Sequence, residues 1–155
     1  MRYYTEADFT PCRSIGYVMK RVHKAAHGLI ENRFRDLDLS FSQWCALALI
    51  GGGIVDTSVA LARDLGHNSG ATTRLVDSLE EKGLIHRERD EEDRRIVRLS
   101  LTEAGKAAGT ALTPRVIDFW NDALEDFSPA EVDQFMNMLQ RLTGKLEQLA
   151  AEEGA

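Results

Sequence analysis

The spacing of apolar residues predicts two long helices in the first third of the chain. Between residues 13 and 34 the apolar side chains recur at steps of three and four, which is the period of one helical face. The polar run DLDLS ends this pattern. Ser40 and Gln43 then have the spacing of a capping box, in which each side chain satisfies the backbone N–H of the other residue. The helix that follows, up to the glycines at 51–53, is apolar almost all round, so we expect it to be buried.

Two shorter helices with a very brief connection are expected next. Thr57 is a suitable N-cap for SVALARDL, and Gly66 is a typical C-terminal stop. Asn68 would cap the second segment, SGATTRLVDSLEE, which Gly83 ends. In the first helix the residues expected to face inward are Val59, Leu61, Ala62 and Leu65. In the second helix they are Thr72, Leu75, Val76 and Leu79.

The outward face of the second short helix carries small polar residues and an arginine near its N-terminus. Its members are Ser69, Gly70, Thr73, Arg74 and Asp77. A helix, a tight turn and a second helix with such a face form the plan of a helix-turn-helix motif.

A hairpin and two more helices complete the expected fold. Residues 84–89 and 96–101 alternate like strands on either side of a charged turn, so they predict a β-hairpin, or wing, attached to the helix-turn-helix. Thr102 would cap a long helix to Phe127, which Pro114 should kink or split. The run Ser128-Pro129-Ala130-Glu131 is a complete start signal for the last helix.

The predicted fold class is therefore mainly α with a small β-wing, within a single domain of residues 1–155. Residues 39–101 form a winged helix-turn-helix lobe, and residues 1–38 and 102–155 form a helical region. The apolar stripes of the first and last helices are too long for the small core of one subunit. We therefore expect these segments to be dimerisation helices of a symmetric homodimer.

The charge distribution and the composition limit the kinds of partner that we expect for the chain. The net charge of −6 comes entirely from residues 102–155, which hold 4 basic and 10 acidic side chains, so the acidity does not exclude a DNA-binding surface in the lobe. No apolar run approaches the ~20 residues of a membrane span, no secretory signal is seen, and two cysteines make no disulfide framework. We expect a cytoplasmic protein with no membrane partner.

No motif of an enzyme or of a cofactor site stands out. The glycines at 51–53 have no following Lys-Ser/Thr and no preceding strand, so they are not a phosphate-binding loop. A nucleophile elbow and an HExxH zinc motif are also missing from the sequence. We expect a protein that is not an enzyme and needs no cofactor.

The segment LARDLGHNSGATTRLVDSLEEKGLIHRERDEEDRRIVRLSLTEAG, residues 61–105, resembles the multiple antibiotic resistance regulator (MarR) family of bacterial winged-helix transcription regulators. The matching pieces are the polar start of the second short helix, the Gly-Leu-Ile run, the Asp-Arg-Arg of the wing and the Leu-Thr-Glu-Ala-Gly that follows. The earlier LSFSQWCALALI is a weaker match. The resemblance implies a homodimer that binds double-stranded DNA, more often as a repressor, and responds to an effector.

The second short helix would contribute the first set of DNA contacts. N–H groups at a helix N-terminus bind phosphate or approach base edges, and Ser69, Gly70, Thr72 and Thr73 keep that end uncluttered. Arg74 can reach a phosphate or pair with guanine in the major groove. The alternative is that Arg74 pairs with a carboxylate of its own lobe, Asp77 or Asp64.

The wing would contribute the second set. The resemblance implies that Arg95 enters the minor groove, with Asp93 holding its guanidinium by a charge-assisted hydrogen bond. Arg94 and Arg98 are then phosphate partners, and the carboxylates of residues 90–92 restrain non-specific binding. The alternative is a solvated turn of balanced charges.

Three features could sense a signal. An aromatic pocket for a small aromatic or phenolic effector could be lined by Met19, His23, His27, Phe41 and Trp44. Core packing explains Met19, Phe41 and Trp44 equally well, and the two histidines could simply be a surface pair. Cys12, near the start of the first helix, offers redox sensing, one helical turn earlier than in the family's hydroperoxide sensors. His23 and His27 have a metal-ligand spacing but no evident third ligand. Cys45 lies in the apolar helix and is expected to be inert.

Two other functions fit the same fold. One is a redox-sensing regulator that uses Cys12, and the other is a winged-helix module that contacts proteins and does not bind DNA.

Overall fold

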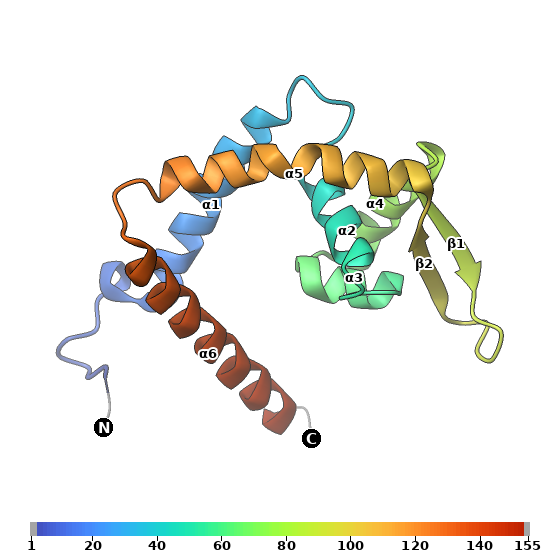
Figure 1. Cartoon of the computed structure of the whole chain (residues 1–155). Coiled ribbons are helices and arrows are strands. Elements are labelled where there is room, and N and C mark those ends of the chain that lie inside the picture. Colours follow the sequence, from blue (N-terminus) through green and yellow to red (C-terminus); the bar gives the residue numbers. More distant parts are fainter. Residues whose placement is uncertain (1–2, 154–155) are drawn as a thin grey trace. The chain divides into compact units, whose positions relative to one another are not determined.

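A computed structural model describes residues 3–153, and its elements follow the predicted order (Figure 1). They are a short 3-10 helix Pro11–Arg13, α1 (Ile15–Arg33), α2 (Phe41–Gly51), α3 (Ser58–Leu65), α4 (Ser69–Glu81), β1 (Ile85–Arg89), β2 (Val97–Leu101), α5 (Glu103–Ala123) and α6 (Pro129–Glu153). The fold is mainly helical with one two-stranded sheet, which confirms the predicted class. The chain divides into two units, with the boundary inside α5 between Val116 and Ile117.

The predicted caps fix the ends of the helices. Ser40 and Gln43 form the full capping box, with Ser40 N–H donating to Gln43 Oε1 at 2.9 Å and Gln43 N–H donating to Ser40 Oγ at 3.2 Å. Thr57 caps α3, and Asn68 caps α4 by accepting from the N–H of Ala71 at 2.9 Å. Gly66 between them has φ +64°, a left-handed conformation that favours glycine. Each cap stabilises its helix by about 0.5–2 kcal/mol.

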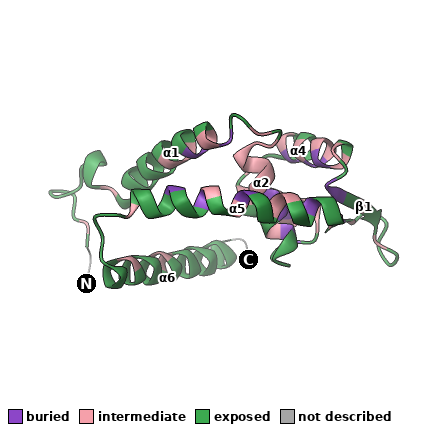
Figure 2. Cartoon of the chain, turned by 45° about the horizontal axis from the view of Figure 1, so that its top comes forward, coloured by how far each residue is buried: buried purple, intermediate pink, exposed green. Residues whose placement is uncertain are grey.

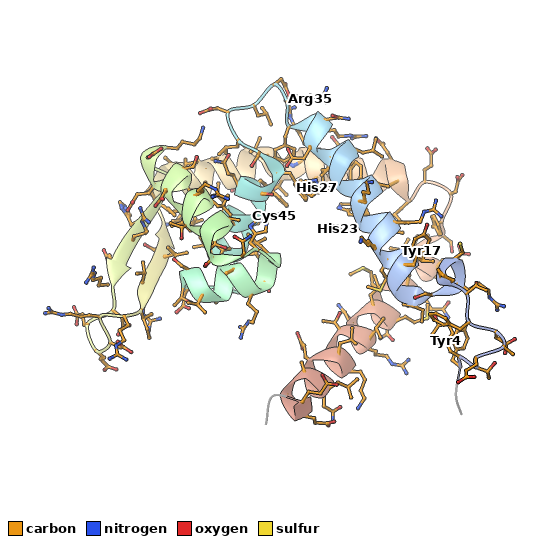
Figure 3. All side chains as sticks on the ribbon, turned by 180° about the vertical axis from the view of Figure 1, so that it is seen from behind. Tyr4, Tyr17, His23, His27, Arg35 and Cys45 are labelled. Atoms are coloured by element: carbon orange, nitrogen blue, oxygen red, sulfur yellow. The ribbon has the colours of Figure 1, made fainter. Side chains whose placement is uncertain are left out.

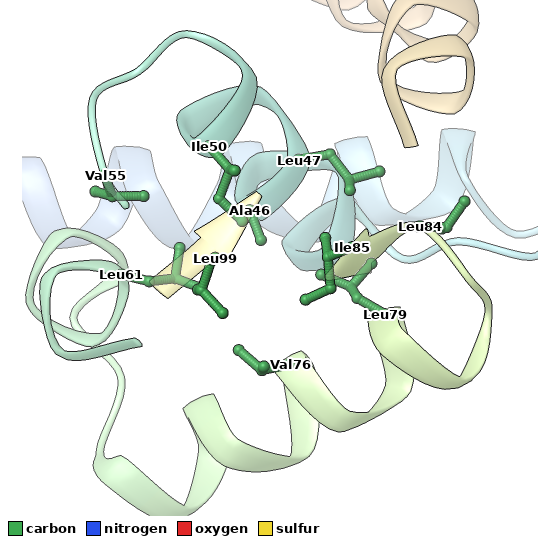
Figure 4. Close-up of a cluster of buried hydrophobic side chains, with 10 residues drawn as sticks. All are labelled: Ala46, Leu47, Ile50, Val55, Leu61, Val76, Leu79, Leu84, Ile85 and Leu99. Atoms are coloured by element: carbon green, nitrogen blue, oxygen red, sulfur yellow. The ribbon is translucent and has the colours of Figure 1, made fainter. Parts of the chain in front are cut away.

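The core of the first unit lies where α2, α3, α4 and the two strands meet (Figure 4). Ten buried apolar side chains point into this one cluster: Ala46, Leu47, Ile50, Val55, Leu61, Val76, Leu79, Leu84, Ile85 and Leu99. Each large aliphatic side chain so buried contributes about 1.5–3 kcal/mol. The helix-turn-helix and the hairpin therefore share a core, which fixes the base of the wing relative to α4.

The two strands pair antiparallel, with Arg87 opposite Leu99 and Glu88 opposite Arg98. The residues before α3 extend this pairing, since the N–H of Leu99 donates to the carbonyl of Asp56 at 2.8 Å. The wing is therefore held at its base by backbone hydrogen bonds on both sides of β2.

A glycine lets α5 approach the start of the wing. The Thr102 side chain accepts from the N–H of Gly105 at 2.9 Å and donates to the carbonyl of Gly83 at 2.7 Å. A Cβ on Gly105 would stand only 1.9 Å from the carbonyl oxygen of Leu84. The Leu-Thr-x-x-Gly run thus joins the helix to the turn between α4 and β1.

Three details of the helices differ from the predictions. Val59 is 81% exposed instead of inward, because the eight-residue α3 buries only Leu61. Pro114 does not split α5, which continues through it as one helix. That helix ends at Ala123 and not at Phe127, and the predicted start signal then opens α6, with Glu131 accepting from both the N–H and the hydroxyl of Ser128.

Most residues of α1 and α6 are exposed (Figure 2), and many of them are large and apolar. α6 has no buried residue along its 25 positions. Its exposed large apolar side chains are Phe135, Met136, Met138, Leu146 and Leu149, and those of α1 are Ile15, Tyr17, Val18, Met19, Val22 and Leu29. Many large apolar side chains of these two helices are thus exposed to solvent.

Candidate nucleic-acid interface

The N-terminal turns of α4 present the expected polar face. Ser69, Gly70, Thr73 and Arg74 are all exposed, and the Thr73 hydroxyl donates to the carbonyl of Ser69 at 2.9 Å. Because Gly70 has no side chain, the backbone of this turn can be approached closely. The face thus offers hydroxyl groups, accessible backbone and one long cation.

Thr72 is not part of that face. Its side chain is 2% exposed, and its hydroxyl donates to the carbonyl of Asn68 at 3.2 Å. The Thr72 side chain therefore faces the core, and the expected DNA contact of this residue stays a prediction for its backbone only. The sequence also placed Thr72 in the inward-facing stripe of this helix, and that assignment agrees with the structure. Helical periodicity assigns a residue to one face only.

Arg74 has no ion pair or side-chain hydrogen bond anywhere in residues 3–153. Asp77, one of the two carboxylates that could have bound it, pairs instead with Arg87. The Arg74 guanidinium extends toward the start of α4, since Nη1 lies 4.0 Å from the place where a Cβ on Gly70 would stand. Its charge is therefore available to a ligand at the helix N-terminus.

Arg87 links the first wing strand to α4. Its Nη1 donates to Asp77 Oδ1 at 2.7 Å and its Nε to Glu80 Oε2 at 2.8 Å, and Nη2 also contacts Glu80. The hydrogen bonds from Arg87 lower the pKa of Glu80. One guanidinium from the sheet thus holds two carboxylates on successive turns of the helix. The sequence did not point to this contact, because nothing in its spacing pairs residue 87 with α4.

Arg98 has a similar structural role on the second strand. Its Nε donates to Asp90 Oδ2 at 2.6 Å, and its Nη1 contacts Asp56 before α3. In the chain without DNA, two carboxylates already compensate the charge of Arg98, and its expected contact with phosphate stays a prediction.

Asp90 organises the turn of the wing. Its Oδ1 accepts the N–H groups of Glu92 and Asp93, each at 3.0 Å, while its other oxygen binds Arg98. The hydrogen bond from the Asp93 backbone, followed by that from Arg98, lowers the pKa of Asp90. Of the three carboxylates expected to restrain non-specific binding, this one is committed to the turn, whereas Glu91 and Glu92 are exposed.

Asp93 holds Arg95 differently from the expectation. Its Oδ1 accepts the backbone N–H of Arg95 at 3.0 Å, and no bond to the guanidinium occurs in the described chain. The side chain of Arg95, like that of neighbouring Arg94, is exposed and makes no ion pair within residues 3–153. The turn is therefore held by carboxylate-to-backbone bonds, which leave two unpaired cations at its tip.

An apolar hollow beside Arg95 could not be foreseen. It has a volume of about 340 Å³ and lies between the start of α3 and β2, lined by Thr57, Ser58, Val59, Arg95, Ile96 and Val97. The exposed Val59 faces it, so the residue that departs from the predicted stripe borders the candidate interface.

The residues expected to line an effector pocket form a chain of ring contacts. His27 meets Phe41 edge-on at 6.0 Å between ring centroids, and Phe41 stacks on Trp44 at 5.8 Å. His23 lies one turn before His27 on α1, with 5.9 Å between their rings (Figure 3), and Met19 is exposed. In the described residues no three His, Cys, Asp or Glu side chains gather as a metal site.

The two cysteines differ in environment. Cys12 is exposed in the 3-10 helix that precedes α1. Cys45 is half-buried in α2, where burial and the nearby charge of Glu31 raise the pKa of its thiol to about 11. A thiol with such a pKa is protonated near neutrality and is a poor nucleophile, as expected for an inert residue.

No helix within residues 3–153 is both long and apolar enough to cross a lipid bilayer.

Comparison with known proteins places this interface in context. Residues 37–96, which include the helix-turn-helix and most of the wing, match the model of the MarR family. The wild-type MarR of E. coli in its apo form is 25% identical, with a TM-score of 0.72 over 83% of this chain and 96% of that one.

Two further solved structures have the same fold. The transcriptional regulator BldR of Sulfolobus solfataricus is 24% identical, with a TM-score of 0.79 over 92% of this chain and 99% of that one. BpsR of Bordetella bronchiseptica, whose DNA binding is regulated by 6-hydroxynicotinic acid, is 17% identical, with a TM-score of 0.74 over 87% and 96% of the two chains. Both align with nearly the whole chain, so the agreement extends beyond the winged-helix lobe.

Proposed function

Since residues 37–96 match the model of the MarR family, we propose that this chain is a repressor of that family. We propose that it binds a pseudo-palindromic operator as a homodimer and is released by a small effector. The observation that carries the proposal is the sorting of arginines in the lobe. Arg87 and Arg98 are paired with carboxylates, while Arg74, Arg94 and Arg95 are left unpaired on α4 and the wing tip. Unpaired cations on the reading elements are what a phosphate backbone requires.

Each unpaired arginine has a proposed role. Arg74, with Ser69, Gly70 and Thr73, lies at the helix N-terminus that would enter the major groove. Arg95 would enter the minor groove, where a narrow groove attracts guanidinium groups, and Arg94 would bind a phosphate. We do not assign DNA contacts to Thr72 or Arg98, since the first is buried and the second compensated.

The homodimer is proposed from the uncovered helices. Segments 1–38 and 102–155 would form the interface, because α6 buries none of its residues within a single chain. A two-fold dimer presents two identical reading heads, so we expect half-sites about 10 base pairs apart, or a multiple of that spacing. A repressor of this kind acts beside the chromosome, so we place it in the cytoplasm.

The effector is proposed to be a small aromatic molecule. BpsR responds to 6-hydroxynicotinic acid, and the ring cluster of His27, Phe41 and Trp44 offers stacking partners for such a ligand. Met19 and His23 would border the same place. Binding there would release DNA by favouring an arrangement of the dimer whose two reading heads no longer match the half-sites.

The test is a binding titration with DNA. Duplexes selected from a random library are labelled, and fluorescence anisotropy is measured over a salt series. With two copies that each neutralise three or more phosphates, we expect a log–log salt slope of about −5 or steeper. Arg95→Ala should weaken binding, whereas Arg35→Ala, which removes an exposed arginine outside the lobe, should not. A protein-contact module would select no sequence and lose no affinity with Arg95→Ala.

A further inference from the structure

We infer that Arg87 is a positioning residue for operator recognition, which sets the placement of the wing tip relative to α4 without touching DNA. This inference rests on the proposed function. It concerns a residue that is part of neither reading element's exposed surface but joins the two.

The geometry of Arg87 suits a rigid link. Its guanidinium binds two carboxylates, Asp77 and Glu80, which lie three residues apart and so occupy successive turns of α4. Its side chain is 30% exposed, compared with 50% for Arg98. Of the two wing arginines that pair with carboxylates, Arg87 is therefore the more enclosed. A planar guanidinium that binds two anchors fixes an orientation, which a single ion pair does not.

The link acts on the part of the wing that the core does not hold. Ile85 and Leu99 bury the base of the hairpin, but from Arg89 to Ile96 every residue except Asp90 is exposed. Arg87 is the last residue of β1 whose side chain bonds to a helix, and the turn with Arg94 and Arg95 follows directly. On the side of β1, the direction in which the tip leaves the lobe therefore depends on this contact, while Arg98 with Asp56 holds β2.

The two carboxylates also lie near the reading face. Thr73 and Asp77 are four residues apart, so they occupy one side of α4, with Glu80 one turn further along. A purely electrostatic role for Arg87 would thus be to neutralise charges that repel phosphates. The two roles make opposite predictions when the carboxylates are removed and the arginine is kept.

The first experiment is a double-mutant cycle with Arg87→Gln and Arg95→Ala, measured as anisotropy against the selected operator and against random duplex. We expect Arg95→Ala and Arg87→Gln each to weaken operator binding roughly tenfold, the size of one lost base-edge contact. If Arg87 acts through Arg95, the double variant should lose little more than Arg95→Ala alone. Fully additive losses would overturn the inference.

The second experiment removes the anchors. Asp77→Asn with Glu80→Gln deletes two negative charges beside the DNA, so binding to random duplex should strengthen or stay constant. We expect operator binding to weaken all the same, so that the ratio of specific to non-specific affinity falls several-fold. A parallel rise in both affinities would mean that Arg87 only neutralises charge, which would contradict a positioning role.

Two controls separate positioning from folding and from direct contact. Lys82→Gln removes an ion pair, with Asp38, at the end of α4 that is remote from its polar N-terminal face, and it should leave the ratio of specific to non-specific affinity unchanged. Arg87→Lys keeps the charge but not the two-anchor geometry, and we expect it to behave like Arg87→Gln. If Arg87→Lys bound like the wild type, charge would suffice and the inference would fall.

Failure of the inference differs from failure of the proposed function. If the wild-type chain selects no DNA sequence, the repressor proposal fails. If it selects an operator and Arg87→Gln binds that operator as well as the wild type does, only the role of Arg87 is refuted. Far-UV circular dichroism and the melting temperature of each variant confirm that the compared proteins are folded.

Discussion

The winged-helix lobe and the last helix solve the burial of apolar side chains in different ways. In the lobe, ten apolar residues from three helices, two strands and the segments between them close on one another within a single chain. In α6 a comparable stripe, with Phe135, Met136 and Leu146, stays exposed along the helix. The first region is therefore stable by its own contacts, whereas the second depends on a surface that it does not itself supply. In the proposed function, reading DNA and assembling the dimer would therefore be tasks of separate regions.

The base and the tip of the wing differ in a similar way, in whether their arginines are paired with carboxylates. At the base of the wing, Arg87 and Arg98 are bound to carboxylates, and at its tip Arg94 and Arg95 are free in the described chain. Acidic residues around the tip do not simply cancel its field, because Asp90 and Asp93 bind backbone N–H groups and shape the turn. In the wing, ion pairs and carboxylate-to-backbone bonds hold a turn that presents two unpaired cations, Arg94 and Arg95.

The largest effect is expected from Leu61→Ala in the lobe. Leu61 is fully buried in the core cluster, so its truncation should lower the free energy of unfolding by about 2–5 kcal/mol. Leu149→Ala in α6 is the matched control, and it should change the stability of the isolated chain little. Urea unfolding at low protein concentration measures the free energy of unfolding of both variants. If the two variants lost equal stability, the proposed difference between the lobe and α6 would be contradicted.

A charge on the stripe of α6 should weaken assembly. Leu146→Glu would remove about 1.5–3 kcal/mol of apolar burial per copy from the proposed interface and add a charge there. Sedimentation velocity should show a monomer at concentrations where the wild type is dimeric, with the spectrum of the lobe unchanged. Gln140→Glu adds the same charge to the same helix at a polar position and should leave the dimer intact. An unchanged dimer for Leu146→Glu would place the interface elsewhere.

The junction between the lobe and α5 should be sensitive to one methyl group. Gly105→Ala places a Cβ against the backbone carbonyl of Leu84, so we expect a loss of about 1–3 kcal/mol, as for other overpacked sites. Gly109→Ala in the same helix meets only Leu47, at 3.7 Å, and should stabilise by about 0.4–1 kcal/mol. The melting temperatures of the two variants test this prediction. If both melting temperatures shifted in the same direction, the close approach of Gly105 to Leu84 would be refuted.

The smallest effect is expected from pH in the turn of the wing. Because the folded state lowers the pKa of Asp90, its contribution to stability is complete above the ordinary pKa of about 4 and is lost as the pH falls through the lower folded value. The protection factors of the Glu92 and Asp93 amides should therefore stay constant above the ordinary pKa of an aspartate and fall only as the pH drops toward the lower folded value. Asp90→Asn should remove this pH dependence; protection that does not change with pH in the wild type would contradict the role of the carboxylate.

Local signals made most of the fold predictable from the sequence. Caps such as Ser40 with Gln43, and the glycine at 66, act within a few residues, so the ends of helices could be read directly. The side chain of Thr72 was assigned to DNA by its position in the turn, although the period of the helix placed it inside. The short α3 offered too few positions to fix its face, which is why Val59 was misplaced.

Contacts between residues of different helices and strands could not be predicted from such local signals. Arg98 meets Asp56, 42 residues away, and that pairing depends on the register of the hairpin and the path of the loop before α3. The same holds for Arg87 with α4. For this reason the sequence could name the basic residues of the wing but could not tell which of them are free. The assignment of DNA contacts to Arg74, Arg94 and Arg95 stays a prediction.

The central claim is that two copies of this chain bind one sequence-specific duplex through their unpaired arginines. Native mass spectrometry of the selected operator complex, with anisotropy across a salt series, tests it most directly. The account predicts two chains per duplex, a log–log salt slope of about −5 or steeper, and a shallower slope for Arg94→Ala with Arg95→Ala. One chain per duplex, or an affinity indifferent to sequence and to these two arginines, would contradict it.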